Sequence, residues 1–326
     1  MKAIVYREYG PPDVVRLDDV ETPTPGDSDI LIQIHAAVVT TPDVAFRKGV
    51  PFMARTATGL MKPKKHILGS ELAGRVHAVG SDVSRFKAGD RVVAASATDF
   101  GAHAEYISLP DDGAVAPLPD DLTYEDAVAI TEGALTALPF LRDKAGIRGG
   151  QRVLINGASG SVGSSAVQLA KHFGAEVTAV TSGANAELVL SLGADHVIDY
   201  TQEDYTQNGQ TYDIVFDAVG KNSFSRSKKV LAEGGVYLTT VPSVAIVIHS
   251  LTSRFGSKKA VFSATGLRSA SDKTRDLLLV EELIEDGTLV PVIDRRYPLE
   301  EADTAHAYVE TGHKKGVVVL TVRASD

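Results

Sequence analysis

The stretch Val153-Leu-Ile-Asn-Gly-Ala-Ser-Gly-Ser-Val-Gly163 decides the fold, because an apolar β-branched run, a glycine turn and a helix start follow in that order. This order is typical of a dinucleotide site, where a pyrophosphate binds at a helix N-terminus. Gly160 lets the pyrophosphate approach the backbone, and Gly163 lets the helix pack closely on the strand. Ala158 replaces the usual first glycine, so a ligand-free βα turn remains the alternative. The predicted cofactor ligands in this segment are Asn156, Ser159, Gly160, Ser161, Val162 and Gly163.

Strand and helix patterns alternate around this turn, and they predict a doubly wound parallel sheet. Six apolar runs are predicted strands: Arg152–Ile155, Glu176–Thr181, His196–Ile198, Asp213–Val219, Gly235–Val241 and Ala260–Ser263. Two helices are predicted here, one after Gly160 and one over Ala186–Leu192.

The flanking parts of the chain have a different pattern. The first ~115 residues predict short strands, among them Ile30–His35, Arg91–Ala95 and Ala104–Leu109. A segment rich in Pro, Asp and Gly at 110–121 indicates a domain boundary. After about residue 270 we expect a helix over Thr274–Glu285 and strands over Val290–Ile293 and Gly316–Val322.

Composition excludes several classes of function. The 326 residues suffice for two domains, and a formal net charge of −9 disfavours nucleic acids and anionic membranes as partners. The densest basic stretch, from Lys62 to His66, is interpreted as a solvated loop. Cysteine is absent, which excludes disulfides, thiol nucleophiles and cysteine-ligated metals. With Arg7 and Glu8 interrupting any apolar leader and no long apolar run, we expect a cytoplasmic protein with no membrane partner.

The end of the second predicted strand bears on the choice of cofactor. Sites selective for NAD place Asp or Glu there to bind the ribose hydroxyls, but Val180–Asn185 contains no acid. Ser182 and Asn185 can instead donate hydrogen bonds to a 2′-phosphate, which favours NADPH over NADH. This loop lacks the expected Arg or Lys, and the alternative is that Thr181 and Ser182 only cap the next helix.

Two enzyme families commonly carry such a turn. Short-chain dehydrogenases need Tyr-x-x-x-Lys, and none of the ten tyrosines has Lys four residues later. The chain instead resembles the medium-chain dehydrogenase/reductase superfamily, in particular its zinc-free quinone oxidoreductase branch. The resemblance rests on MKAIVYREYGPPDVVRL, LGSELAGRVHAVGSDVSRFKAGDRV, GAHAEYISLP, TEGALTA, VLINGASGSVGSSAVQLAK, LGADHVIDY, FDAVG and HKKGVVVLTV, in order over about 300 residues.

The resemblance implies an α/β fold in which a Rossmann doubly wound parallel sheet is inserted into a GroES-like β domain. The expected parts are residues 1–119, the N-terminal part of the GroES-like catalytic domain; 120–265, the nucleotide-binding domain; and 266–326, which complete the catalytic domain. Zinc-dependent relatives hold the metal through Cys, His-Glu and Cys, but here those positions fall on Thr40, Ser70-Glu71 and near Glu132. Hydroxyl groups are poor zinc ligands, so no zinc is expected, and Glu71 is interpreted as structural.

What remains is hydride transfer from NADPH to a quinone or an α,β-unsaturated carbonyl, which delocalises the incoming charge itself. By resemblance the substrate lies in the interdomain cleft. The predicted catalytic residues are Thr40 and Asp43, and the predicted substrate-binding residues are Thr41, Phe46 and His249. The further cofactor-binding residues implied are Thr136, Ser182, Asn185, Tyr200, Ala218, Val219, Val241 and Lys315.

Other readings remain open at this point. An enoyl reductase and an NADP-dependent alcohol dehydrogenase use the same scaffold, and a non-catalytic NADPH-binding protein belongs to a different class. A homodimer formed through the edge of the nucleotide-domain sheet is expected by resemblance.

Overall fold

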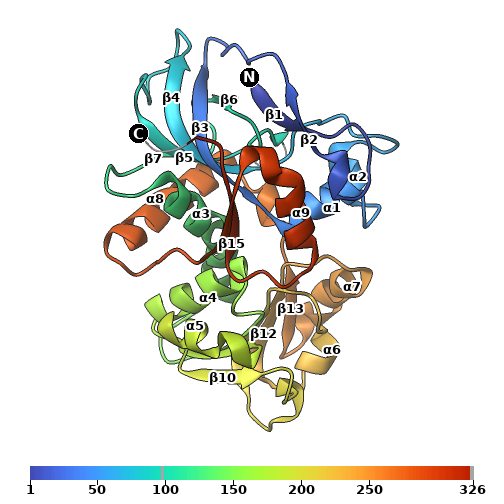
Figure 1. Cartoon of the computed structure of the whole chain (residues 1–326). Helices are drawn as coiled ribbons and strands as arrows, with labels where there is room; N and C mark the ends of the chain where they lie inside the picture. The colour runs from blue at the N-terminus through green and yellow to red at the C-terminus, as the bar shows by residue number, and fades with distance from the viewer. Residues whose placement is uncertain (97–98, 324–326) are drawn as a thin grey trace. The chain divides into compact units, whose positions relative to one another are not determined.

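The computed structural model describes residues 1–96 and 99–323 (Figure 1). Two compact units make up the chain. Unit 1 comprises Met1–Glu132, Gly266–Glu282 and Pro291–Asp326, and unit 2 comprises Gly133–Thr265 and Leu283–Val290. Among the described residues, no helix has the length and apolar character needed to cross a membrane.

Unit 1 is built on a mostly antiparallel sheet in the order β14-β15-β3-β4-β5-β7, with β6 also paired to β3. The last strand returns to the first part of the chain, since β15 pairs antiparallel with β3 and sets Val318 opposite Val39. Side chains from both ends of the chain therefore share one core, which includes Ile32, Val318 and Leu320. The bounds are β3 (Asp29–Val39), β4 (Glu71–Val79), β5 (Arg91–Ala95), β6 (Tyr106–Pro110), β7 (Val115–Pro117), β14 (Ile293–Pro298) and β15 (Val317–Thr321).

The remaining elements of unit 1 are short. Strands β1 (Lys2–Val5) and β2 (Arg16–Asp19) form a separate two-stranded sheet. The helices that belong to this unit alone are α1 (Thr41–Lys48), α2 (Ala54–Thr58) and α9 (Ala302–Glu310). Helices α3 (Tyr124–Pro139) and α8 (Ala270–Glu285) contribute residues to both units.

Unit 2 contains a six-stranded parallel sheet in the order β10-β9-β8-β11-β12-β13. This order, 3-2-1-4-5-6 in chain sequence, is the doubly wound dinucleotide-binding arrangement. The central strand β8 is fully buried at Val153, Leu154 and Ile155, as expected where helices cover both faces of a sheet. The strands are β8 (Arg152–Asn156), β9 (Glu176–Thr181), β10 (His196–Asp199), β11 (Tyr212–Asp217), β12 (Leu231–Thr239) and β13 (Lys259–Phe262), and the helices are α4 (Ser161–His172), α5 (Ala186–Ser191), α6 (Phe224–Ser227) and α7 (Val244–Thr252).

The structure confirms the predicted fold class and corrects one predicted strand. Strands β5 and β9 have the bounds that the sequence predicts. The strand predicted over Val290–Ile293 is wrong, because β14 begins only at Ile293. The backbone of Val290 pairs with the Gln168 side chain instead of a strand: its N–H donates to Oε1 at 2.8 Å and its carbonyl accepts from Nε2 at 3.2 Å.

Candidate functional site

The glycine turn of unit 2 leaves the N-terminus of α4 open. Gly160 precedes the helix with φ −80° and ψ 173°, and this N-cap position provides no side-chain hydrogen bond to the first turn. A Cβ atom at Gly160 would meet only the Gly157 carbonyl oxygen, at 3.5 Å, whereas a Cβ at Gly163 would lie 2.1 Å from that oxygen. Gly163 is therefore required for close packing, and Gly160 faces free space. The backbone amides at this end of the helix offer a binding position for an anion.

Ser159 is oriented by two neighbours. Its Oγ accepts from Thr181 Oγ1 at 2.9 Å and from Asn185 Nδ2 at 3.1 Å. Both contacts use the oxygen as acceptor, which leaves the Ser159 hydroxyl proton free for a ligand. Asn185 Oδ1 is buried without a hydrogen-bond partner. Ser159 therefore retains one unused donor, and Asn185 retains one unused acceptor.

The turn after β9 lacks the helix cap that the sequence left open as the alternative to a 2′-phosphate site. Ser182 precedes a 3₁₀ turn over Gly183–Asn185 without forming a side-chain cap, and α5 also begins without one. The alternative in which Ser182 caps the following helix is therefore wrong, and its hydroxyl is left for other partners. Tyr200 is exposed, and its N–H donates to the carbonyl of Thr181 at 3.1 Å, which ties β10 to this turn.

An acidic side chain reaches the same turn from the neighbouring strand, a contact that the sequence analysis missed. Asp199 ends β10, and a Cβ on Gly183 would lie 2.7 Å from its Oδ2. The pKa of Asp199 is lowered, first by the hydrogen bonds that Thr201 donates from its N–H at 2.9 Å and its Oγ1 at 2.8 Å. A backbone hydrogen bond from Gly183 lowers this pKa further. The carboxylate is therefore ionised and shared between two loops.

Asp217 joins three strand ends at the switch point of the sheet. Its fully buried carboxylate accepts from Asn156 Nδ2 on β8 at 2.9 Å and from Tyr237 Oη on β12 at 2.9 Å. The N–H groups of Val219 and Gly220 donate to the same carboxylate at 3.2 and 3.0 Å. Burial raises the pKa of Tyr237, and the charge of Asp217 raises it further, so the phenol stays protonated as a donor. Asp217 thus fixes the loop that carries the predicted ligands Ala218 and Val219.

Other predicted residues of unit 2 have different surroundings. Val241 is half exposed after β12, and its N–H donates to Thr239 Oγ1 at 3.3 Å. His249 lies on α7, 3.3 Å from Ser225 Oγ, with its ring against Phe224. Thr136 lies on α3 and is partly buried. Their predicted roles toward cofactor and substrate stay predictions.

Thr40 and Asp43 form a capping box at the start of α1 in unit 1. Asp43 Oδ2 accepts from the Thr40 N–H at 2.8 Å and from Thr40 Oγ1 at 2.6 Å, and Thr40 Oγ1 accepts from the Asp43 N–H at 3.1 Å. Asp43 Oδ1 accepts from the Gly69 N–H at 3.1 Å. Both side chains are buried, and this arrangement positions α1 and the turn at Gly69. A catalytic role for the pair stays a prediction.

The other predicted residues of unit 1 lie around this start of the helix or in the last loop. Thr41 is exposed at the first position of α1, and Phe46 packs edge-on against Phe100 with ring centroids 5.0 Å apart. The Lys315 N–H donates to Asp294 Oδ2 at 2.8 Å, which holds the last loop, while its side chain is exposed.

Glu71, which is interpreted from the sequence as structural, is part of a polar cluster. Ser70 Oγ donates to Glu71 Oε2 at 2.9 Å. Burial raises the pKa of Glu71 to about 8, and the nearby carboxylates of Glu132 and Asp43 add to that shift. Glu132 Oε2 is buried without a partner. Lys273 is 6% exposed and donates to the Gly266 carbonyl at 2.6 Å; burial lowers its pKa, and Glu71 opposes that change. At neutral pH Glu71 is therefore mostly a neutral acid.

Two of the residues at the expected zinc positions, Thr40 and Ser70, are poor ligands for the metal. Thr40 Oγ1 is engaged on both sides by Asp43, and Ser70 Oγ is engaged with Glu71. Zinc prefers thiolate, imidazole and carboxylate ligands. Within residues 1–96 and 99–323 no group of three His, Cys, Asp or Glu side chains is arranged to hold a metal ion.

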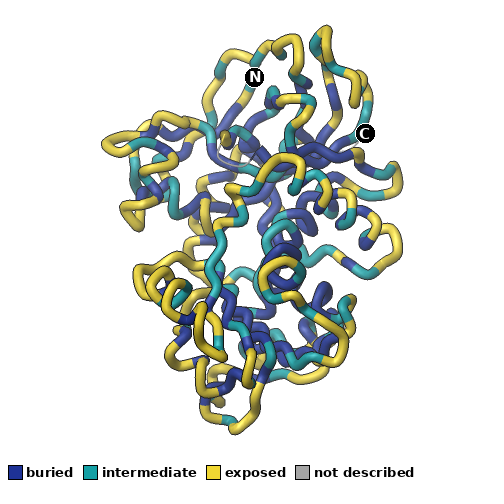
Figure 2. The backbone as a smooth tube through the Cα atoms, turned by 180° about the vertical axis from the view of Figure 1, so that it is seen from behind, coloured by how far each residue is buried: buried dark blue, intermediate teal, exposed yellow. Residues whose placement is uncertain are grey.

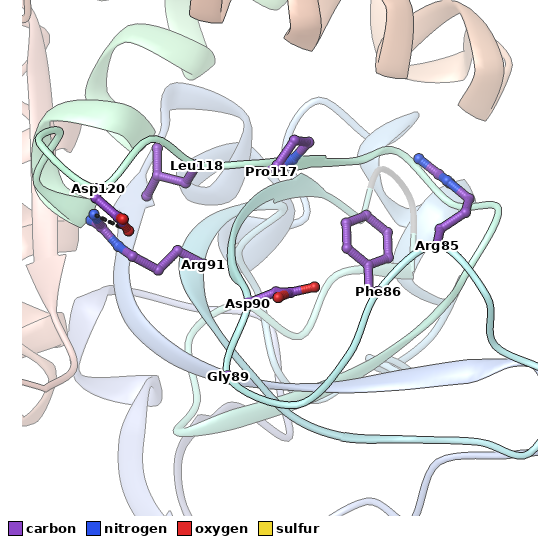
Figure 3. Close-up of a pocket in the computed structure, with 8 residues that line it drawn as sticks. All are labelled: Arg85, Phe86, Gly89, Asp90, Arg91, Pro117, Leu118 and Asp120. Carbon is purple, nitrogen blue, oxygen red and sulfur yellow. Dashed lines mark ion pairs between the residues drawn. The ribbon is translucent and has the colours of Figure 1, made fainter.

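A separate recess of about 530 Å³ lies at the surface of unit 1 beside β5 (Figure 3). Arg91 and Asp120 form a 3.9 Å ion pair on its wall, and Asp120 is fully exposed. None of the predicted site residues lines this recess, whose lining is Arg85, Phe86, Gly89, Asp90, Arg91, Pro117, Leu118 and Asp120. It is a separate surface feature and plays no part in the candidate site.

Residues 26–120 match the family model of the alcohol dehydrogenase GroES-like domain, and residues 192–320 match that of a zinc-binding dehydrogenase. The chain is 34% identical to the 2-methylene-furan-3-one reductase of Solanum lycopersicum, over 98% of this chain and 79% of the relative. It is 30% identical to the quinone oxidoreductase of Homo sapiens, over 96% and 94%.

Solved structures agree with these relatives. The quinone oxidoreductase of Coxiella burnetii superposes with a TM-score of 0.89 at 30% identity and covers 99% of both chains. The Escherichia coli quinone oxidoreductase, solved in complex with NADPH, superposes with a TM-score of 0.85 at 27% identity, over 98% of this chain and 100% of that one. The chain belongs to the quinone oxidoreductase branch of the medium-chain dehydrogenase/reductase superfamily, and it is an oxidoreductase.

Proposed function

We propose that this chain is an NADPH-dependent, zinc-independent reductase that transfers hydride to a quinone or an α,β-unsaturated carbonyl. The observation that carries the proposal is the open N-terminus of α4, with free space at Gly160 and an unused hydroxyl proton on Ser159. When bound, NADPH supplies the hydride. The amides at the start of α4 would hold the pyrophosphate, and Ser159 would donate to it. We also propose that the protein works in the cytoplasm, a compartment that suits a chain without cysteine. We further propose that it works without zinc.

The preference for NADPH rests on the turn after β9. The Ser182 hydroxyl forms no helix cap and can donate to a 2′-phosphate. Asn185 Nδ2 donates one hydrogen to Ser159 Oγ, and its second hydrogen can donate to the same phosphate. Asp199 is the feature that opposes a 2′-phosphate, because its carboxylate lies at Gly183. Relatives support the phosphate, since the Escherichia coli quinone oxidoreductase was solved with NADPH.

The preference for conjugated acceptors rests on the hydroxyl groups at and near the start of α1. The hydroxyl of Thr40 is engaged with Asp43 and the hydroxyl of Ser70 with Glu71, so neither hydroxyl is available to hold a Lewis-acid metal that would activate an alcohol. Quinones and enones accept hydride without such activation. The names of the relatives in Solanum lycopersicum and Homo sapiens support an enone and a quinone, respectively.

NADPH oxidation by metal-stripped protein tests this proposal. A water-soluble 1,4-quinone and a 2-alkenal are assayed in parallel with NADPH and with NADH, and each assay is repeated after addition of zinc. We expect turnover of at least one acceptor, faster with NADPH and unchanged by zinc. Alcohol oxidation that appears only with zinc would overturn the proposal, and NADPH binding without any turnover would indicate a non-catalytic NADPH-binding protein.

We further propose that two copies associate through the edge of the unit 2 sheet. Strand β13 is the last strand of the described sheet, and α7 beside it exposes Val244 at 79% and Leu251 at 60%. Phe255, which follows this helix, is 98% exposed. Sedimentation should show a dimer that Phe255→Asp weakens. A monomer at micromolar concentration would contradict this part of the proposal.

A further inference from the structure

Basic residues are concentrated in one segment of unit 1. Between Asp43 and Glu71 there are six Lys and Arg residues and no Asp or Glu, although the whole chain carries a net charge of −9. Arg47 and Lys48 are paired with Glu310, and Lys65 lies 3.3 Å from Asp99. The described contacts leave the cationic ends of Lys62 and Lys64 facing solvent, since both residues are exposed and neither has an ion pair among the residues described.

The same segment exposes large apolar side chains. Phe52 is 66% exposed, Met53 70%, Leu60 58% and Met61 92%. These four residues and the lysines lie within residues 50–65, here called the 50–65 loop, which surrounds α2 (Figure 1). Figure 2 shows much of the backbone at this edge of unit 1 as exposed. Exposed apolar side chains gathered beside cations are typical of a binding surface rather than of a solvated loop.

The base of the 50–65 loop is held in place, so these apolar groups are not displayed by an unstructured chain. Tyr9 Oη lies 2.8 Å from Thr58 Oγ1 and also donates to the Gly59 carbonyl. The Lys64 N–H donates to the Thr58 carbonyl at 2.6 Å. The Arg55 guanidinium lies over the Tyr9 ring at 4.5 Å. A preformed loop of this kind loses little conformational entropy on binding.

We propose that the 50–65 loop docks the protein on an anionic lipid surface, with Phe52, Met53, Leu60 and Met61 entering the headgroup region and Lys62 and Lys64 contacting anionic headgroups. Amphipathic segments bind membranes through this combination of buried apolar area and positive charge. The net charge of −9 predicts repulsion from an anionic surface, but charges farther than about 10 Å are largely screened at ordinary ionic strength. The proposal goes beyond the reductase function, because lipid binding needs no turnover; an acceptor dissolved in the bilayer would then be within reach.

A tryptophan reporter tests the docking directly, because the chain contains no tryptophan. Met61→Trp is mixed with vesicles of phosphatidylcholine alone or with added phosphatidylglycerol, each with and without brominated lipid. Leu190→Trp is the matched control, a reporter at 48% exposure on α5 of unit 2, outside both proposed binding surfaces. We expect a blue shift and bromine quenching for Met61→Trp on anionic vesicles only, weakened by raised salt. Absence of quenching there, or equal quenching of the control reporter, would overturn the proposal.

Charge reversal tests the electrostatic part. Lys62→Glu with Lys64→Glu should weaken sedimentation with anionic vesicles at least tenfold, because each lysine near such a surface contributes about 1 kcal/mol. Lys228→Glu with Lys229→Glu, at exposed lysines of unit 2, should leave vesicle binding unchanged. Reduction of a water-soluble acceptor should be the same in both double variants, so failure of docking is distinguishable from failure of the reductase proposal. Vesicle binding by the Lys62/Lys64 double variant that equals that of the wild-type protein would contradict docking on lipid. Self-association of the protein without lipid, in place of vesicle binding, would contradict it as well.

Discussion

Gly160→Asp places a negative charge at the proposed pyrophosphate site without disturbing the fold. The backbone at Gly160 has φ −80°, which any residue adopts, and a Cβ there would meet only one oxygen, at 3.5 Å. Asp is a good residue before a helix, and it interacts favourably with the helix dipole. The melting temperature should therefore stay the same or rise slightly.

The same substitution should greatly weaken NADPH binding. A carboxylate about 4 Å from a phosphate charge costs roughly 4 kcal/mol at an effective dielectric constant of 20. This corresponds to a dissociation constant raised about a thousandfold. Titration of NADPH fluorescence measures the dissociation constant, and a thermal melt of the same sample measures stability.

The neutral variant Gly160→Asn separates charge from volume, because Asn has the size of Asp. We expect Gly160→Asn to lose much less affinity than Gly160→Asp. Unchanged NADPH affinity in Gly160→Asp would refute the assignment of the site to the start of α4. Equal losses in the two variants would refute the electrostatic reasoning.

Three further predictions concern single side chains. Asp199→Asn should favour NADPH over NADH by several-fold relative to wild type, because it removes the carboxylate at Gly183; the ratio of kcat/KM for the two cofactors measures it. Glu71 has a pKa of about 8 in the fold against an ordinary value of 4.5, so the folded state holds an extra proton between these two pH values. Stability should fall as pH rises through this window, by up to about 1.4 kcal/mol per pH unit, and Glu71→Gln should flatten that fall in denaturant titrations. Gly163→Ala should destabilise unit 2 by about 1–3 kcal/mol, seen as a lower denaturation midpoint, because its Cβ would lie 2.1 Å from the Gly157 oxygen.

Local patterns in the sequence predict the elements of the fold well. The run Glu176–Thr181 is β-branched and apolar and becomes β9 with those bounds. The turn before Gly163 needs only nearby residues for its shape, so its strand–turn–helix order could be predicted. The error at Val290 has a different cause, because its backbone pairs with Gln168, 122 residues away in the chain.

The missed features of the candidate site depend on contacts between distant segments. Asp199 reaches Gly183 only because β10 lies beside β9 in the sheet. Asp217 joins three strand ends, a role that the spacing of Asp217-Ala-Val-Gly220 does not reveal. Glu71 acquires its raised pKa from burial and from Glu132, 61 positions later. Charge environments of this kind follow from packing rather than from sequence spacing.

Transfer of the label from deuterated NADPH shows whether this protein moves hydride from the cofactor to a conjugated acceptor. NADPH carrying deuterium at the reactive position of the nicotinamide is incubated with metal-stripped protein and a 2-alkenal, and the product is analysed by mass spectrometry. We expect one deuterium on the β-carbon of the saturated aldehyde and none when Gly160→Asp replaces the wild-type protein. A product without deuterium, or label appearing on the carbonyl carbon of an alcohol, would contradict it.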